Sequence, residues 1–232
     1  MSELEGYEFI TTENEEKING SHKRGIVVKV LLFAGVVMLS LNSSAKAETL
    51  NSVSHIHHVK VIENKVHVLT HEGLFELVGK NDMKLVGKDR IDVMGFTSLG
   101  KVLVASGHPA VGSKMPNPIG VVKSIDGGLT WQAVSLVGKV DFHFLEGAGS
   151  DLYGADSQSG NLMYSADSGN TWKSLGANTF TDIAVSPEIS GMAIAIKSSE
   201  LTLTKNAFKS TTKMKNNLKI TQLEWRNSGL YA

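Results

Sequence analysis

Short stretches of alternating apolar and polar residues fill the chain from about residue 54 onward. Residues 65–69 and residues 101–105 are two examples, and each is followed by turn-forming residues. Alternation with a period of two predicts β-strands that bury one face. The 23 glycines and the aromatic content of only 6% favour many short strands joined by tight turns. Similar strand-like runs open near residues 55, 92, 141 and 182. The pattern therefore predicts an all-β protein.

The N-terminal part of the chain has a different pattern, with one continuous apolar run at residues 30–41. Lys23 and Arg24 precede this run, and Ala45 and Ala47 follow it. A basic segment, an apolar segment and an A-x-A site in this order are typical of a secretory signal peptide. We therefore expect cleavage after Ala47.

An uncleaved membrane anchor is the alternative for this segment. The apolar run is shorter than the roughly 20 residues that span a bilayer as a stable helix, which favours a signal peptide. The long stretch that precedes the run favours the anchor, in which residues 26–41 would lie in the membrane. Both alternatives divide the chain into an N-terminal extension, residues 1–47, and a secreted or otherwise extracytoplasmic domain, residues 48–232.

An eight-residue motif occurs twice in this domain, at a spacing of 41 residues. Residues 124–131 and residues 165–172 share the pattern S-x-D-x-G-x-T-W. In such a turn the Asp side chain can accept backbone N–H groups, Gly tolerates a positive φ, and Trp packs the turn onto its sheet. We therefore interpret the motif as structural. Its defining residues are Ser124, Asp126, Gly128, Thr130, Trp131, Ser165, Asp167, Gly169, Thr171 and Trp172.

The motif spacing divides the domain into four similar units. A period of about 40–45 residues with several short strands is typical of a β-propeller, in which each repeat forms one four-stranded blade. Counting from the two motifs places decayed copies at Asn81 and Asn206, and it places the blade starts near residues 54, 91, 140 and 181. Complete propellers have about 4–8 blades. Four repeats thus indicate a small ring or, as we expect, a truncated part of a larger one.

The repeated motif resembles the Asp box of the bacterial neuraminidase repeat (BNR), which sialidases, sortilin-type receptors and photosystem assembly factors carry. The segments around His55, His71, His108 and His143 also resemble those of small exported bacterial Asp-box proteins labelled glycosyl hydrolase or sortilin-like. This resemblance covers roughly residues 54–205 and implies a propeller. The glycosidase label follows only from the repeat, and fold does not determine chemistry.

Composition excludes several classes of function. The 23 basic and 23 acidic residues balance, so nucleic acid is not expected as a partner. The absence of cysteine excludes disulfides, thiolate metal sites and a cysteine nucleophile. Beyond residue 47 the arginines are Arg90 and Arg226, too few for the arginine triad with which sialidases hold their substrate.

Seven of the eight histidines lie between residues 55 and 143. The first strand of a propeller blade lines the central channel, and the end of the antiparallel second strand returns to the same mouth. The register then predicts a cluster at one mouth, opposite the face that carries Asp126 and Asp167. Its members are His55, His57, His71, His108, His143, Asp141 and Asp156. Neutral imidazoles suit a divalent transition metal such as zinc or copper. Alternatively, these side chains only form hydrogen bonds in a polar mouth.

These observations leave two interpretations of function. In the first, the chain is a non-catalytic interaction module of the cell envelope that binds an envelope protein or a glycan, with a candidate metal at the mouth. In the alternative it is a glycoside hydrolase other than a sialidase, which needs two carboxyl groups about 5–10 Å apart. Asp92, Asp141 and Asp182 are the candidates, and whether the protein is an enzyme stays open. The proline-rich segment 109–118 is expected to form a rim or lid beside the mouth.

The signal-peptide interpretation predicts that the exported protein begins at Glu48, because Ala45 and Ala47 present the small side chains that the peptidase reads. Intact mass analysis of the exported protein tests this. A mass that includes residues 1–47 would show that the segment is retained as an anchor.

Overall fold

The computed structural model describes residues 48–215 and 219–232. The predicted signal peptide or anchor and its cleavage site fall in residues 1–47 and therefore lie outside the described residues. In the described ranges, no helix has the length and apolar character needed to cross a membrane.

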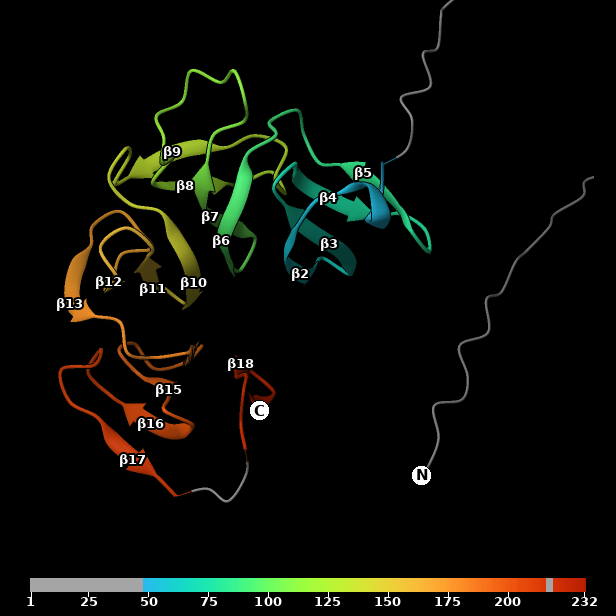
Figure 1. Ribbon diagram of the computed structural model, residues 1–232. Coiled ribbons are helices and arrows are strands. Elements are labelled where there is room, and N and C mark those ends of the chain that lie inside the picture. The colour runs from blue at the N-terminus through green and yellow to red at the C-terminus, as the bar shows by residue number, and fades with distance from the viewer. Residues whose placement is uncertain (1–47, 216–218) are drawn as a thin grey trace, which may run out of the picture. The chain divides into compact units, whose positions relative to one another are not determined.

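The described residues form successive antiparallel sheets of four consecutive strands each, which we call blades 1 to 4 (Figure 1). Blade 1 contains β2 (Ile56–Ile62), β3 (Lys65–Thr70), β4 (Gly73–Leu77) and β5 (Asp82–Leu85). Blade 2 contains β6 (Asp92–Leu99), β7 (Val102–His108), β8 (Val121–Ser124) and β9 (Gln132–Ser135). Blade 3 contains β10 (Phe142–Ala148), β11 (Asp151–Asp156), β12 (Asn161–Ser165) and β13 (Lys173–Ala177). Blade 4 contains β14 (Asp182–Val185), β15 (Ala193–Lys197), β16 (Glu200–Thr204) and β17 (Thr212–Met214).

Short elements at both ends extend this arrangement. Strand β1 (Glu48–Thr49), followed by the 3-10 turn η1 (Leu50–Ser52), pairs with β5 at the outer edge of blade 1. At the other end β18 (Glu224–Arg226) and β19 (Gly229–Tyr231) form a hairpin. Strand β18 lies beside β14, in the position that the first strand of a following blade would take. The Leu223 N–H donates to Asp182 Oδ2 at 2.6 Å and fixes this approach.

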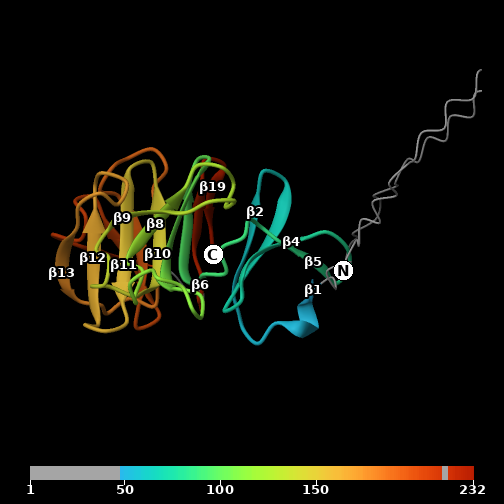
Figure 2. The ribbon, with the colours of Figure 1, turned by 90° about the horizontal axis from the view of Figure 1, so that it is seen from above.

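The first strands of the blades, β2, β6, β10 and β14, lie next to one another around a common centre (Figure 1). Figure 2 shows the strands of blades 2 and 3 side by side in the perpendicular view. This arrangement confirms the expected all-β propeller built from four-stranded blades.

Apolar cores lie between neighbouring blades. Leu69 and Leu74 of blade 1 meet Phe96 and Leu103 of blade 2, and all four side chains are almost fully buried. Similar clusters join blade 2 to blade 3 around Phe142, and blade 3 to blade 4 around Tyr153 and Ile183. Since a single four-stranded sheet buries little surface by itself, packing between blades stabilises each sheet.

The repeated motif forms the turns between the third and fourth strands of blades 2 and 3. In blade 2, Ser124 Oγ accepts the Gly128 N–H at 2.8 Å, and Asp126 accepts the N–H and hydroxyl of Thr130 at 3.0 and 2.6 Å. These hydrogen bonds lower the pKa of Asp126 to about 2. Gly128 has a φ of 92°, which explains the requirement for glycine. The same contacts recur in blade 3 among Ser165, Asp167, Gly169 and Thr171.

The two predicted decayed copies of the motif have different outcomes. In blade 4 the Phe208 N–H donates to Thr204 Oγ1 and the Ser210 N–H donates to Asn206 Oδ1, both at 2.9 Å, so this turn repeats the motif's hydrogen bonds with other residue types. The expectation at Asn81 is wrong. Strands β4 and β5 are joined by a short turn in which the Val78 N–H donates to the Asp82 carbonyl, and this turn has no room for the longer motif.

The tryptophans of the motif are half-buried rather than fully buried. The Trp172 indole N–H donates to the Gly169 carbonyl at 3.0 Å and to Ser135 Oγ at 3.1 Å. Its ring lies 4.9 Å from the Phe142 ring. Trp172 thus ties the motif turn of blade 3 to β9 of blade 2 and to the core between these blades.

This geometry predicts that Trp172→Ala lowers the free energy of unfolding by about 2–4 kcal/mol, at the low end for aromatic truncation because the ring is only half-buried. Trp172→Phe is the matched control. It keeps an aromatic ring against Phe142 and loses only the indole hydrogen bonds, which costs about 1 kcal/mol. Urea unfolding measures both values, and equal stabilities of the wild type and the Ala variant would contradict the structural interpretation.

Candidate functional site

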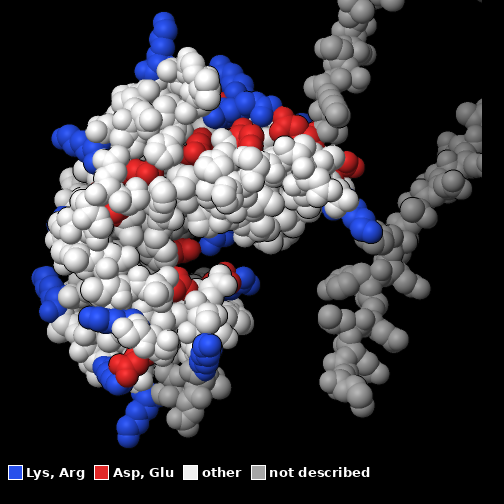
Figure 3. All heavy atoms as spheres, in the orientation of Figure 1, with Lys and Arg blue, Asp and Glu red and all other residues white. Residues whose placement is uncertain are grey.

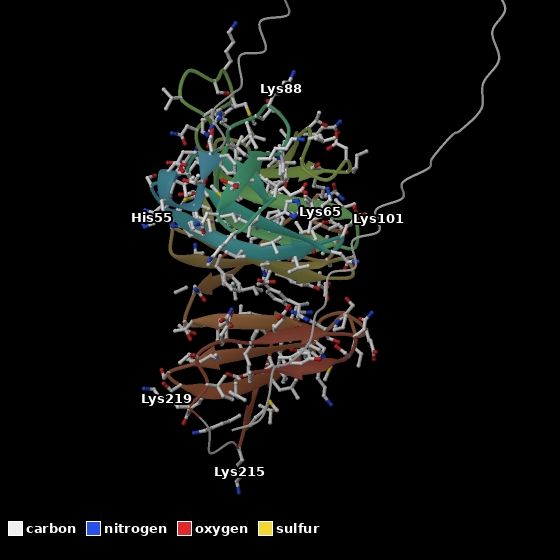
Figure 4. All side chains as sticks on the ribbon, turned by 90° about the vertical axis from the view of Figure 1, so that its right-hand side faces the viewer. His55, Lys65, Lys88, Lys101, Lys215 and Lys219 are labelled. Atoms are coloured by element: carbon white, nitrogen blue, oxygen red, sulfur yellow. The ribbon has the colours of Figure 1, made fainter. Side chains whose placement is uncertain are left out.

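A central channel of about 1050 Å³ runs between the first strands of the blades. Figure 3 shows this hollow, with acidic and basic side chains on its wall. Figure 4 labels His55 at one end of the strands and Lys65 and Lys101 at the other end. The end that carries His55 is the mouth at which the sequence predicted a histidine cluster.

A β-bulge shapes this mouth in blades 1, 2 and 3. The pairing between the first two strands shifts between Ile56 and His58, between Val93 and Gly95, and between Phe142 and Phe144. A bulge leaves one extra residue outside the ladder and changes the direction of its side chain. The residues at the bulges are His57, Met94 and His143. In blade 4 the strands pair without such a shift.

The first group of side chains, which we call triad 1, contains His57 and His71 of blade 1 and Asp92 of blade 2. His71 Nδ1 lies 2.8 Å from Asp92 Oδ2, and His57 Nε2 lies 3.5 Å from Asp92 Oδ1 and also 3.5 Å from His71 Nδ1. These three ligand atoms can therefore surround one ion. The His55 ring lies 5.2 Å from the His71 ring and 5.7 Å from the His57 ring.

The electrostatics of triad 1 favour neutral His57. Burial lowers the pKa of His57 below its ordinary value, and the neighbouring His71, His55 and His143 lower it further, while Asp92 opposes them. A neutral imidazole has a free nitrogen lone pair and is the form that binds metals.

A second group, which we call triad 2, contains His108 of blade 2 with Asp141 and His143 of blade 3. Asp141 Oδ2 lies 2.8 Å from His143 Nε2 and 3.3 Å from His108 Nε2. The Ser157 hydroxyl donates to the same oxygen at 2.8 Å. These ligand atoms, too, are close enough to surround one ion. The predicted single cluster is thus two groups, each of which joins neighbouring blades.

Asp156 lies at the predicted mouth, next to Asp141, but it belongs to neither triad. Its carboxylate accepts the Asp141 N–H at 2.9 Å and both the N–H and the hydroxyl of Ser159, which lowers its pKa. His58 and His67, the two histidines of residues 48–232 that were not predicted as ligands, contact backbone carbonyls instead. His58 Nε2 contacts the Met94 carbonyl at 2.9 Å, and His67 is buried inside β3 with Nδ1 near the Lys65 carbonyl.

Sequence reasoning did not identify Asp92 as a possible ligand, although it opens blade 2 just as Asp141 opens blade 3. The shared position of these two residues was the available signal. Asn117, whose Oδ1 lies 2.8 Å from His108 Nδ1, was also missed, because segment 109–118 has no counterpart in the other repeats.

The motif turns lie away from the triads along their strands. In blade 2, Asp92 pairs with His108 at one end of the β6–β7 ladder, whereas Ser124 pairs with Leu103 near the other end. In blade 3, Phe142 likewise pairs with Asp156, and Ser165 with Leu152. This register separates the structural turns from the candidate site within each sheet.

The middle of the channel has its own charged contact. Lys60 Nζ of blade 1 reaches across to Glu146 Oε1 of blade 3 at 3.1 Å. Burial raises the pKa of Glu146, and nearby Asp182 and Glu224 add to the rise, while Lys60 opposes it. Lys60 therefore supplies the compensating positive charge for this part of the channel.

No model of a known protein family matches the chain, and no curated protein matches it. Solved structures that are similar to it at low identity include the following three. "YCF48 bound to D1 peptide" is 17% identical with a TM-score of 0.48, and the match covers 80% of this chain and 62% of that one. The GH74 xyloglucanase from Xanthomonas campestris is 14% identical with a TM-score of 0.49, and the match covers 79% of this chain and 30% of that one. PorZ of Porphyromonas gingivalis is 14% identical with a TM-score of 0.47, and the match covers 77% of this chain and 24% of that one. The chain thus spans less than two thirds of each, and these likenesses carry no argument about its function.

The channel contact predicts that Lys60→Met raises the pKa of Glu146 further, because the substitution removes the charge and the hydrogen bond that lower it. An NMR titration of ¹³C-labelled glutamate carboxyl groups measures the change. Lys65→Met is the control, because Lys65 pairs with Glu76 instead, at 2.9 Å. An unchanged or lower pKa of Glu146 in the Lys60 variant would show that another group balances this charge.

Proposed function

We propose that residues 48–232 form an exported, non-catalytic Asp-box propeller of the cell envelope that binds through the mouth of its channel, and that triad 1 holds a divalent transition-metal ion there. The observation that carries the proposal is the convergence of two imidazoles and a carboxylate from adjacent blades on one point. The proposed partner is a protein or glycan of the envelope.

The distances in triad 1 suit such an ion. Ligand atoms about 2.0–2.1 Å from a tetrahedral zinc ion are about 3.3 Å from one another. The contacts of His57 Nε2 with Asp92 and with His71 are both 3.5 Å, and the contact between His71 and Asp92 is 2.8 Å. Small side-chain rotations would bring all three atoms to this geometry. Two imidazoles and one carboxylate favour zinc, copper or nickel over calcium or magnesium.

Three protein ligands leave a coordination position open to water or to a donor from a partner. The side chain of His71 is 36% exposed, so triad 1 is accessible from solvent. His55, which is exposed and stacks on His57 with an interplanar angle of 16°, is the side chain on the chain itself best placed to approach this position. An open position at an accessible mouth supports a role in binding a partner.

The glycoside hydrolase alternative receives less support from the channel carboxyl groups. Asp92 and Asp141 contact imidazoles, and Asp182 accepts two backbone N–H groups. Glu146 has the raised pKa that a general acid needs, but it pairs with Lys60. A two-carboxylate mechanism requires a second group free to act as base or nucleophile. Each of these four carboxyl groups already contacts a partner through at least one of its oxygens, so we favour binding over hydrolysis.

Zinc titration of the exported protein, purified without a histidine tag, tests the proposal. We expect the ion of triad 1 to bind at least about 100-fold more weakly in the double variant His57→Gln/His71→Gln, so that the variant binds one zinc ion fewer than the wild type, since losing ligands costs more than the 10–100-fold typical of their outer partners. His58→Gln is the matched control. It changes the next histidine in the sequence, which contacts the Met94 carbonyl instead. An unchanged number of bound zinc ions in the double variant, with unchanged affinities, would refute triad 1 as the site.

A further inference from the structure

We propose that triad 2 is a second, independent ion site, and that the loop at residues 109–118 controls its affinity through Asn117. This inference goes beyond the proposed function, which requires triad 1 alone. The two triads share no residue. Triad 1 joins blade 1 to blade 2, and triad 2 joins blade 2 to blade 3.

The buried carboxylate of Asp141 is the first argument for this site. Its side chain is only 6% exposed, and Oδ1 has no hydrogen-bond partner among the described residues. Oδ2 receives the Ser157 hydroxyl and faces the imidazoles of His108 and His143. A buried carboxylate oxygen without a donor is costly, because it has lost its water without replacement. A cation held by this carboxylate would supply the missing interaction.

The orientation of His108 is the second argument. Its Nδ1 lies 2.8 Å from Asn117 Oδ1, a carbonyl oxygen that can only accept, so Nδ1 carries the ring proton. The other nitrogen, Nε2, is then the one that can bind a metal ion. It faces Asp141 Oδ2 at 3.3 Å. About 3.3 Å is also the separation of two tetrahedral ligand atoms on one zinc ion.

The role of Asn117 is that of a positioning residue. Metal-binding histidines usually donate their second N–H to an oxygen, which fixes the ring and its tautomer. The loop that carries Asn117 is held to its blade, because the Ile119 N–H donates to the Gly107 carbonyl at 3.0 Å and Met115 packs against the core between blades 1 and 2. The loop therefore presents the Asn117 oxygen to His108 from a fixed position.

The donor set defines the class of ion. Two imidazole nitrogens and one carboxylate suit zinc, copper or nickel, whereas calcium and magnesium prefer oxygen ligands. The His143 side chain is 46% exposed, so the ion would be open to solvent at the mouth. Triad 2 is thus a site for a divalent transition-metal ion with a free coordination position.

The test counts zinc ions in variants of the exported, untagged protein by competition with a chromophoric chelator. We expect two equivalents in the wild type, one in His57→Gln/His71→Gln, and none when His143→Gln is added to that double variant. His143→Gln alone should keep the single ion of triad 1. Because His143 is exposed, its replacement should leave the fold intact, and circular dichroism checks this.

Asn117 is tested in the His57→Gln/His71→Gln background. Asn117→Ala should weaken zinc binding about 10–100-fold, and Asn117→Asp, which keeps an oxygen for the His108 N–H, should restore it. The visible spectrum of bound Co²⁺ should change with Asn117→Ala as the ligand geometry loosens.

The outcomes separate the two sites. A background variant that binds no zinc, or that keeps its ion after His143→Gln, overturns the proposal for triad 2 whatever triad 1 does. A wild type that binds one ion, lost only with His143→Gln, supports triad 2 and refutes the proposed function of triad 1. An affinity of the Asn117→Ala variant equal to that of its background would overturn the role of the loop.

Discussion

Apolar packing between successive blades is the constraint on which the rest of this structure depends. Each sheet has few strands and buries apolar side chains against its neighbours, as Leu69 does against Phe96 and Phe142 does against Val104. This packing brings the first strands together around one centre, so that residues at the same position in successive blades meet at the mouth. Asp92 of blade 2 reaches His71 of blade 1 for this reason, and no contact within a single blade would bring them together.

The fold could be predicted because the repeated motif consists of the residue types that its turn requires. Asp126 must accept the donors of Thr130, and Gly128 must adopt a positive φ. The same residue types therefore occur in both copies of this turn. The turn at Asn206 keeps the hydrogen bonds with an amide in place of a carboxylate, which made it readable from spacing alone. Spacing failed at Asn81 because a shorter turn joins those strands, and a count of residues does not reveal which turn a hairpin takes.

The candidate site could be predicted only to the level of one shared mouth. Register along the strands indicated that His57, His71 and His143 belong there, since period-two alternation and antiparallel pairing are local properties. Their division into two groups depends on contacts between blades, which register does not specify. Asp156 illustrates what register along the strands cannot predict. It ends its strand just as His108 does, but its carboxylate accepts the N–H and the hydroxyl of Ser159 in the following turn. Asn117 lies in a segment outside the repeat, where no periodic argument applies.

Each triad spans the seam between two blades, and this has a mechanical consequence. Any force that parts blade 1 from blade 2 at the mouth must first break the contact of His71 with Asp92, and parting blade 2 from blade 3 must break that of His108 with Asp141. A ligand bound by side chains of both blades would hold the blades together, and it would stabilise the packed arrangement by mass action. Conversely, a substitution that weakens the packing between two blades lowers the affinity for the ligand. Ligand binding at the mouth and packing between the blades are therefore thermodynamically coupled, so that a change in one changes the other.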